Sequence, residues 1–228
     1  MRYQTIIFDL DDTLLDFQAG EKKGLAHIFQ TFQTATLSYT EWLRVYTQIN
    51  QDIWQQIEQG AAAQPLLNQR FAHTFAHFGQ AIDGCAAEQA YRTILNTNDA
   101  VLPEAATVLH TLQQAGHQLV VGTNGKTETQ QRRLALTGFD RYFQQVVISD
   151  EIGVAKPHLD FFTAIFALYP AQTATDFVMV GDSLRSDIIG AQQAGIASIW
   201  FNPQHSAMTL KQAPTHTITH LTELFSLC

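Results

Sequence analysis

Short, nearly continuous hydrophobic runs recur along the chain, and amphipathic segments separate them. Runs rich in β-branched and aromatic residues are typical of strands buried on both faces of a parallel sheet. Five such runs stand out: Thr5–Leu10, Leu119–Thr123, Gln145–Ser149, Phe177–Gly181 and Ala197–Phe201. Helical periodicity lies between most of them, in Pro103–Ala115, Glu128–Leu136, Leu159–Leu168 and Ser186–Ala194. This alternation predicts a doubly wound α/β fold with a parallel sheet, whose ligand site lies at the carboxyl ends of the strands.

Residues 16–98 depart from this alternation. They contain helical patterns and no convincing strand, in the segments Glu21–Phe32, Thr40–Glu58, Leu66–Phe78 and Ala86–Leu95. Such a stretch is too long for a connection inside a compact sheet domain. We therefore expect an α/β catalytic core of residues 1–15 and 99–228, with a helical cap of residues 16–98 inserted after the first strand. The alternative is a helical layer that packs on the sheet and has no role in the site.

Composition narrows the classes of partner. The chain has 228 residues, of which 46% are hydrophobic and 15% charged. Its longest apolar runs are strand-sized and fall well short of the roughly 20 residues that a membrane helix needs. A net charge of −8 without a basic stripe argues against a nucleic-acid polymer as partner. The two cysteines, Cys85 and Cys228, fit no metal or redox spacing, so we expect reduced thiols and a cytoplasmic protein.

Two carboxylates stand at the end of the first expected strand, in the run Phe8–Thr13, which reads Phe-Asp-Leu-Asp-Asp-Thr. A carboxylate at Asp9 can attack phosphorus in line. A second one close by, at Asp11, can protonate the leaving oxygen and later deprotonate water. The alternative is a polar turn in which Asp12 and Thr13 cap the segment that follows.

The next two strands also end in residues suited to binding phosphate. Thr123 and Asn124 follow the second strand, where a hydroxyl and backbone amides can hold a phosphoryl oxygen. An ordinary Asn-Gly turn is the alternative there. Lys156, in the loop after the third strand, carries an ammonium that would offset the charge of a phosphate and of nearby aspartates. For this residue the alternative is a solvated surface lysine.

A further pair of carboxylates, Asp182 and Asp187, spans the loop after the strand Phe177–Gly181. A strand-to-helix loop of this length can bring both to one point. Magnesium prefers oxygen ligands, and one or two carboxylates plus a substrate phosphate suffice to hold it. The alternative is the ordinary capping of the next helix. Because all four polar loops fall at expected strand ends, in order, the sequence favours one shared site.

These four segments resemble the four motifs of the haloacid dehalogenase superfamily, and they run in that family's order across the whole chain. The resemblance implies that Asp9 is the nucleophile and a Mg²⁺ ligand. It implies that Asp11 is the general acid/base and gives its backbone carbonyl to the metal. Asp182 would ligate Mg²⁺ directly, and Asp187 would order a metal-bound water or the lysine.

The same resemblance implies that Thr123 binds the phosphoryl group and that Lys156 neutralises charge. Asp11 discriminates within the superfamily, because the dehalogenase branch lacks this second aspartate whereas a phosphate monoester with an alkoxide leaving group needs an acid. We therefore expect a phosphatase that acts through an aspartyl-phosphate, with Mg²⁺ as its cofactor.

A finer resemblance links the chain to bacterial YjjG-type 5′-nucleotidases. It rests on Asp9–Glu21, Ile49–Trp54, Glu58–Gly60, Gly181–Ile188 and Trp200–Pro203. It implies a small phosphate monoester as substrate, a nucleoside 5′-monophosphate with a leaning to pyrimidines. Two small departures from that branch, Gly122 before the threonine and Val154-Ala155 before the lysine, leave the chemistry intact. We expect a monomer or a homodimer.

Four residues of the expected cap are candidates for contact with the substrate. Phe17 and Trp54 could stack on a base, Gln18 lies beside Phe17 at the junction of strand and cap, and Asn50 could reach a ribose or base edge. Aromatic residues at helical spacing are more often cap core, and polar ones are more often solvated. Rival functions are a sugar-phosphate or phosphoglycolate phosphatase, a phosphomutase, and a non-catalytic phosphate-binding regulator.

Overall fold

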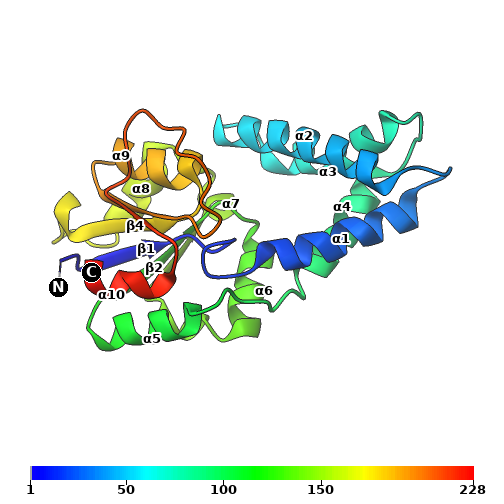
Figure 1. Cartoon of the computed structure of the whole chain (residues 1–228). Coiled ribbons are helices and arrows are strands. Elements are labelled where there is room, and N and C mark those ends of the chain that lie inside the picture. Colours follow the sequence, from blue (N-terminus) through cyan, green and yellow to red (C-terminus); the bar gives the residue numbers. More distant parts are fainter. Residues whose placement is uncertain (1) are drawn as a thin grey trace. The chain divides into compact units, whose positions relative to one another are not determined.

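The computed structural model describes residues 2–228, and the chain divides into two compact units. One unit contains the residues up to Asp16 and those from Asp99 to Cys228; the other is Phe17–Asn98. Figure 1 shows the sheet and its helices in the first unit and a group of helices in the second. Within residues 2–228, no helix combines the length and the apolar character needed to cross a membrane.

A parallel sheet of six strands forms the centre of the first unit. Its strands are β1 (Thr5–Phe8), β2 (Gln118–Thr123), β3 (Gln145–Ile148), β4 (Phe177–Gly181), β5 (Ala197–Phe201) and β6 (His216–Ile218). Their order in space is β3-β2-β1-β4-β5-β6. In the centre, Phe8 of β1 pairs with Val121 of β2 and with Val180 of β4. The predicted fold class is confirmed, and the strand order reverses at β1, the point where such sheets bind ligands.

Alternate side chains of the strands divide the core of this unit into two layers. The helices of the unit are α5 (Ala105–Gln114), α6 (Thr127–Thr137), α7 (Ser149–Ile152), α8 (Leu159–Phe166), α9 (Ile189–Gln193) and α10 (Leu224–Leu227). Ile6 and Phe8 pack in the cluster that includes residues of α5, α6 and α10. Ile7, between them in the sequence, packs against α8 and α9 on the opposite face (Figure 1). Strands with apolar side chains on both faces explain the unbroken hydrophobic runs of the sequence.

Several local features differ from the sequence-based expectation, among them the unpredicted helices α7 and α10, the strand β6 and the start of α9. β6 was not predicted, because a strand of three residues is too short to show a pattern. The helix expected to begin at Ser186 begins two residues earlier, as a π-helical turn, Leu184–Ile188, which leads into α9. Ser183 caps this turn, since its hydroxyl accepts a hydrogen bond from the backbone N–H of Ser186 at 3.1 Å. Single π-helical turns occur frequently at functional sites.

The two segments that lead to and from the second unit are hydrogen-bonded to each other. Leu15 and Val101 form an antiparallel bridge. The N–H of Asp16 donates to the carbonyl oxygen of Ala100 at 3.0 Å, and the N–H of Leu102 donates to the Leu14 carbonyl oxygen at 2.9 Å. The second unit is therefore inserted at the end of a short two-stranded stem, and the stem belongs to the first unit.

Helices account for the regular structure of the second unit. They are α1 (Phe17–Phe32), α2 (Tyr39–Glu58), α3 (Ala63–Ala76) and α4 (Gly84–Leu95), one for each predicted helical segment. Its core is aromatic: the ring of Trp42 stacks on Tyr46 with centroids 5.6 Å apart and on Phe71 with centroids 6.4 Å apart. Such stacking fixes α2 against α3.

A buried ion pair lies beside these rings. Arg70 of α3 donates through Nε and Nη2 to the two carboxylate oxygens of Glu88 of α4, at 2.8 and 2.9 Å. Each side chain is only 2% exposed. The remaining guanidinium nitrogen of Arg70 donates to Asn50 at 3.0 Å and to Tyr46 at 3.4 Å. Arg70 is therefore not on a solvated face, and its donors are satisfied inside the unit.

Candidate active site

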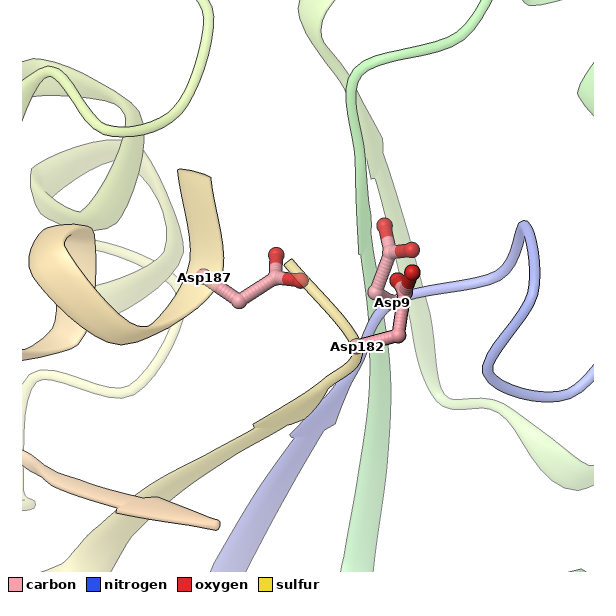
Figure 2. A group of neighbouring side chains, drawn as sticks. All are labelled: Asp9, Asp182 and Asp187. Atoms are coloured by element: carbon pink, nitrogen blue, oxygen red, sulfur yellow. The ribbon is translucent and has the colours of Figure 1, made fainter. Parts of the chain in front are cut away.

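Asp9 follows β1 directly and lies at the centre of the carboxyl edge of the sheet. Its N–H donates to the carbonyl oxygen of Val180 at 2.9 Å, which extends the pairing of β1 with β4 by one residue. The hydroxyl of Thr13 accepts from the N–H of Asp182 at 3.1 Å and donates to that residue's Oδ1 at 3.4 Å. The loops after the two central strands are thus joined, and Figure 2 shows Asp9 and Asp182 side by side.

Lys156 places a buried cation between two carboxylates. Its Nζ donates to Oδ1 of Asp9 and to Oδ1 of Asp187, both at 2.7 Å, and to the carbonyl oxygen of Gly122 at 2.5 Å. The side chain is 1% exposed. An ammonium has three donors, and all three have acceptors here, so the position of the charge is fixed. This lysine is not a solvated surface residue.

Asn124 holds the loop that carries Lys156. Its Oδ1 accepts from the N–H of Lys156, and its Nδ2 donates to the carbonyl oxygen of the same residue, each at 2.8 Å. The side-chain amide of Asn124 is therefore occupied by the backbone of Lys156. The backbone N–H of Asn124 and the second N–H of its Nδ2 are the donors that a phosphate could meet there.

Three carboxylates gather at this edge of the sheet. Asp9, Asp182 and Asp187 each bring one oxygen within 4.8 Å of the others. In Figure 2, Asp9 and Asp182 extend from the ends of β1 and β4, and Asp187 approaches from the π-helical turn. Asp182 and Asp187 belong to one loop, whereas Asp9 is far from both in the sequence, and the pairing of β1 with β4 brings it beside them.

Asp187 reaches this position because Gly181 has no side chain. A Cβ on Gly181 would lie 2.2 Å from Oδ2 of Asp187. That oxygen accepts from the N–H of Ser183 at 3.0 Å, and the other oxygen accepts from Lys156. Both oxygens of Asp187 are thus engaged by protein groups. This geometry suits a residue that positions the lysine.

Burial and crowding of the carboxylates shift their protonation. The pKa of Asp9 is raised to about 7, and burial is the largest cause. Lys156 lowers the pKa, whereas Asp187 and Asp11 raise it further. Burial likewise raises the pKa of Asp182 well above its ordinary value, with Asp9 and Asp187 as the next causes. For Lys156, burial disfavours the ammonium, but Asp187 and Asp9 outweigh it and raise its pKa. With all three carboxylates ionised, the site would carry more negative charge than its one buried lysine offsets, and the raised pKa values of Asp9 and Asp182 favour their protonated forms.

The donor set fits a magnesium ion. Mg²⁺ takes oxygen ligands in an octahedron, keeps several waters and is commonly held by one or two carboxylates plus a substrate phosphate. Asp9 and Asp182 offer adjacent carboxylates, and a cation beside them would favour their ionised forms. Asp187, whose oxygens are both engaged, fits a place outside the direct ligands.

The carboxylate of Asp11 is bound by α6. Its Oδ2 accepts from Nε2 of Gln130 at 2.8 Å, and its Oδ1 forms an ion pair with Nη1 of Arg133. The same amide nitrogen of Gln130 donates to the hydroxyl of Thr123 at 2.9 Å. Gln130 therefore connects two residues that the sequence singled out, Asp11 and Thr123, although neither it nor Arg133 was predicted.

A weak signal for these two residues exists in the sequence. Gln130 and Arg133 are three positions apart, so they lie on one face of the helix that follows Thr123. Polar residues at that spacing ordinarily indicate a solvated face. Only the structure shows that Gln130 and Arg133 are buried, at 1% and 0% exposure.

The four candidate substrate residues lie in the second unit. Phe17 packs at the edge of the aromatic core, and Trp54 packs against a smaller cluster that includes Ile53. Asn50 accepts the hydrogen bond from Arg70, and Gln18 lies in the first turn of α1. A role for these residues in substrate binding stays a prediction.

The sequence model of the haloacid dehalogenase-like hydrolase family matches residues 3–195 of this chain. The pyrimidine 5′-nucleotidase PynA of Streptococcus pneumoniae is 35% identical and aligns with 96% of this chain and 92% of its own. The pyrimidine 5′-nucleotidase YjjG of Escherichia coli is 30% identical, and the match covers 100% and 98% of the two chains.

The solved structures agree with the sequence matches. The HAD-hydrolase YfnB of Bacillus subtilis, crystallised with bound magnesium, superposes with a TM-score of 0.89 at 34% identity, over 100% of this chain and 99% of that one. A dehalogenase structure superposes with a TM-score of 0.78 at 19% identity, over 99% and 97% of the two chains. At that identity the second likeness shows the fold alone.

Proposed function

The chain belongs to the haloacid dehalogenase-like hydrolase family, and from that premise we propose that it is a magnesium-dependent nucleoside 5′-monophosphatase that prefers pyrimidine nucleotides. The family and its named relatives make the chain a phosphomonoester hydrolase with small phosphate esters as substrates. The nucleotide preference is supported by the two pyrimidine 5′-nucleotidases at 35% and 30% identity. The proposal includes action in the cytoplasm, where the two free cysteines would stay reduced.

One observation supports the chemistry above the others: a buried lysine links Asp9 to Asp187 while Asp182 lies beside Asp9. A carboxylate with one oxygen fixed by a cation has the other available for attack on phosphorus. Burial of the cluster excludes water and strengthens each electrostatic contact with a transferring phosphoryl group.

The proposed reaction has two steps. First, with Asp11 in its protonated form and not as the carboxylate that pairs with Arg133, an oxygen of Asp9 forms a bond to phosphorus while the bond from phosphorus to the ester oxygen breaks, and Asp11 gives its proton to that leaving oxygen. This leaves an aspartyl-phosphate and an ionised Asp11. Second, water attacks phosphorus and gives its proton to Asp11, and the bond between phosphorus and the Asp9 oxygen breaks. Phosphate leaves, and both aspartates return to their starting forms.

The other site residues act on charge and position. Thr123 and the backbone N–H of Asn124 would hold phosphoryl oxygens, and Lys156 would offset the charge that builds on them. Bound Mg²⁺ would supply further neutralisation of the phosphoryl group. Asp9, Asp182 and the backbone carbonyl of Asp11 are the proposed ligands. Asp187 would keep Lys156 in place, as its 2.7 Å contact indicates.

We propose in addition that residues 16–98 are the cap that selects the leaving group. The magnesium-bound YfnB structure is reported to reveal interdomain movement. In this chain the inserted unit is joined to the core by a single stem, which would permit such a movement. Phe17, Gln18, Asn50 and Trp54 remain the proposed contacts to the nucleoside.

The test is phosphate release from a panel of nucleoside 5′-monophosphates, sugar phosphates and phosphoglycolate, with Mg²⁺ and with EDTA. We expect Mg²⁺-dependent release with the highest kcat/KM on a pyrimidine nucleotide. A maximum on a sugar phosphate or phosphoglycolate would overturn the nucleotide proposal and keep the chemistry. Undiminished release in EDTA would overturn the magnesium requirement. Trapping of ³²P on the chain after acid quench would test the aspartyl-phosphate separately.

A further inference from the structure

Arg133, the arginine that binds Asp11, is fully buried, which is rare for an arginine side chain. It has 0% exposure and lies among the buried residues of α6, with Gln130 and Leu134. A guanidinium cannot lose its proton in a protein, so its burial requires an anion nearby. Asp11 supplies a carboxylate to it, although the Asp11 side chain is itself 29% exposed. A buried arginine thus faces a partly exposed aspartate that the proposed reaction requires.

Gln130 restrains the second oxygen of the same carboxylate. Its Nε2 reaches Asp11 at 2.8 Å and Thr123 at 2.9 Å. Gly125 makes room for this amide, because a Cβ there would lie 2.3 Å from Nε2. The loop after β2 is therefore shaped around the Gln130 side chain. The amide joins the proposed acid/base to the proposed phosphate-binding hydroxyl.

We propose that Gln130 and Arg133 are positioning residues that set the orientation of the Asp11 carboxyl group relative to the phosphoryl site. The inference rests on the proposed function. A carboxyl group held at both oxygens has a defined rotamer, and a general acid or base must lie within hydrogen-bond reach of the atom it serves. Neither residue is assigned a contact with the substrate. Both act through Asp11, and Gln130 also keeps Thr123 in register with it.

The first experiment compares Arg133→Met with Arg133→Lys and with a matched control, Arg132→Met. Arg132 is the adjacent residue of α6, but it is 61% exposed and pairs with Glu128. On the best nucleotide substrate with Mg²⁺, we expect Arg133→Met to lower kcat on the order of 100-fold, the cost of misplacing a catalytic group by about 1 Å. KM should change less than threefold, Arg133→Lys should recover part of kcat, and Arg132→Met should match the unmodified protein.

A second experiment separates positioning from a structural role. Arg133→Met is combined with Asp11→Asn, and kcat is measured for both single variants and the double variant. If Arg133 acts through Asp11, its loss should cost less than threefold once Asp11 is gone. An undiminished cost in the Asp11→Asn background would overturn the proposal, as would a kcat for Arg133→Met equal to that of the unmodified protein.

A third variant guards against misfolding. Should Arg133→Met lower the Tm below the assay temperature, Gln130→Met gives the same comparison, because it leaves the ion pair in place. We expect it to lower kcat at least tenfold, and an unchanged kcat would remove Gln130 from the proposal. These failures are distinct from failure of the proposed function, which would appear as no phosphate release by the unmodified protein from any nucleotide.

Discussion

Lys156 and Asp9 form an ion pair with 2.7 Å between Nζ and Oδ1, in which the lysine is 1% exposed and the aspartate side chain 11%. The same ammonium binds Asp187, whose side chain is 0% exposed. One buried cation thus serves two buried carboxylates from different loops. Its removal would leave like charges facing one another inside the core.

Replacement of Lys156 by Met should therefore affect stability as well as activity. Loss of one partner from a buried ion pair costs about 3–5 kcal/mol, so we expect the free energy of unfolding in EDTA to fall by roughly 3 kcal/mol. Urea denaturation would measure this change. Lys126→Met is the control, because Lys126 and Asp150 form an ion pair that is 22% and 27% exposed and should contribute less than about 1 kcal/mol. Equal effects of the two substitutions would contradict the assigned role of Lys156.

Replacement of Asp9 by Asn should have the opposite effect on stability. It removes the proposed nucleophile, so turnover should fall to background, yet it also removes a buried carboxylate whose pKa is raised to about 7. At pH 8 in EDTA we expect a Tm equal to or higher than that of the unmodified protein. Calorimetry and phosphate release on one preparation would check both points. Retained turnover would contradict the covalent scheme, once deamidation to Asp is excluded by mass spectrometry.

Stability of the metal-free protein should depend on pH through the same carboxylates. The pKa of Asp9 rises on folding from 3.8 to about 7, so the folded state binds the proton more tightly than the unfolded state. The contribution of Asp9 to the free energy of unfolding is fully present below pH 4. It is lost as the pH rises towards 7, by up to about 4 kcal/mol. The raised pKa of Asp182 acts in the same direction.

Mg²⁺ should reverse this loss, because a bound cation favours the ionised carboxylates. We expect the increase in Tm on addition of Mg²⁺ to be larger at pH 8 than at pH 5.5. Thermal unfolding at both values, with and without EDTA, would measure it. The Asp9→Asn variant should show a smaller difference between the two values of pH. A Mg²⁺ effect independent of pH would contradict this account.

The second unit offers an independent prediction about a buried ion pair. Glu88→Gln would leave the guanidinium of Arg70 buried beside a neutral amide, so we expect the free energy of unfolding to fall by about 3 kcal/mol. Arg92→Met is the matched control. Arg92 binds the same glutamate at 2.7 Å but is 19% exposed, and its loss should cost less. Circular dichroism during urea denaturation would compare them.

The sequence predicted those parts of the site that follow from strand ends. The run Phe8–Thr13 and the loops at Thr123, Lys156 and Asp182 could be placed together, because parallel strands present their carboxyl ends at one edge. The contacts between these residues could not be predicted from the sequence. The paired bonds of Asn124 with the backbone of Lys156 depend on loop geometry, and no residue pattern encodes that.

Gln130 and Arg133 show a different limit. Helical spacing tells which residues share a face, but it does not tell which face turns inward when the face carries polar side chains. Hydrophobic patterning does not predict that Arg133 is buried. The cost of burying its charge is offset by an ion pair with Asp11, which is more than a hundred residues away in the sequence. The same reasoning applies to Arg70 and Glu88, because each of these charged side chains can be buried only when it is paired with the other.

The stem formed by Leu15 and Val101 has a consequence for how the chain can change over evolution. The hydrogen bond from Asp16 to Ala100 joins the two backbone segments just before the helices of the second unit begin. The whole insertion can therefore be treated as one loop whose two ends are held together by the stem. Loop-closure entropy grows only with the logarithm of loop length, and each doubling costs about 0.6 kcal/mol. Insertions of very different length can therefore be exchanged at this base at little thermodynamic cost, while the geometry of the sheet edge is left unchanged.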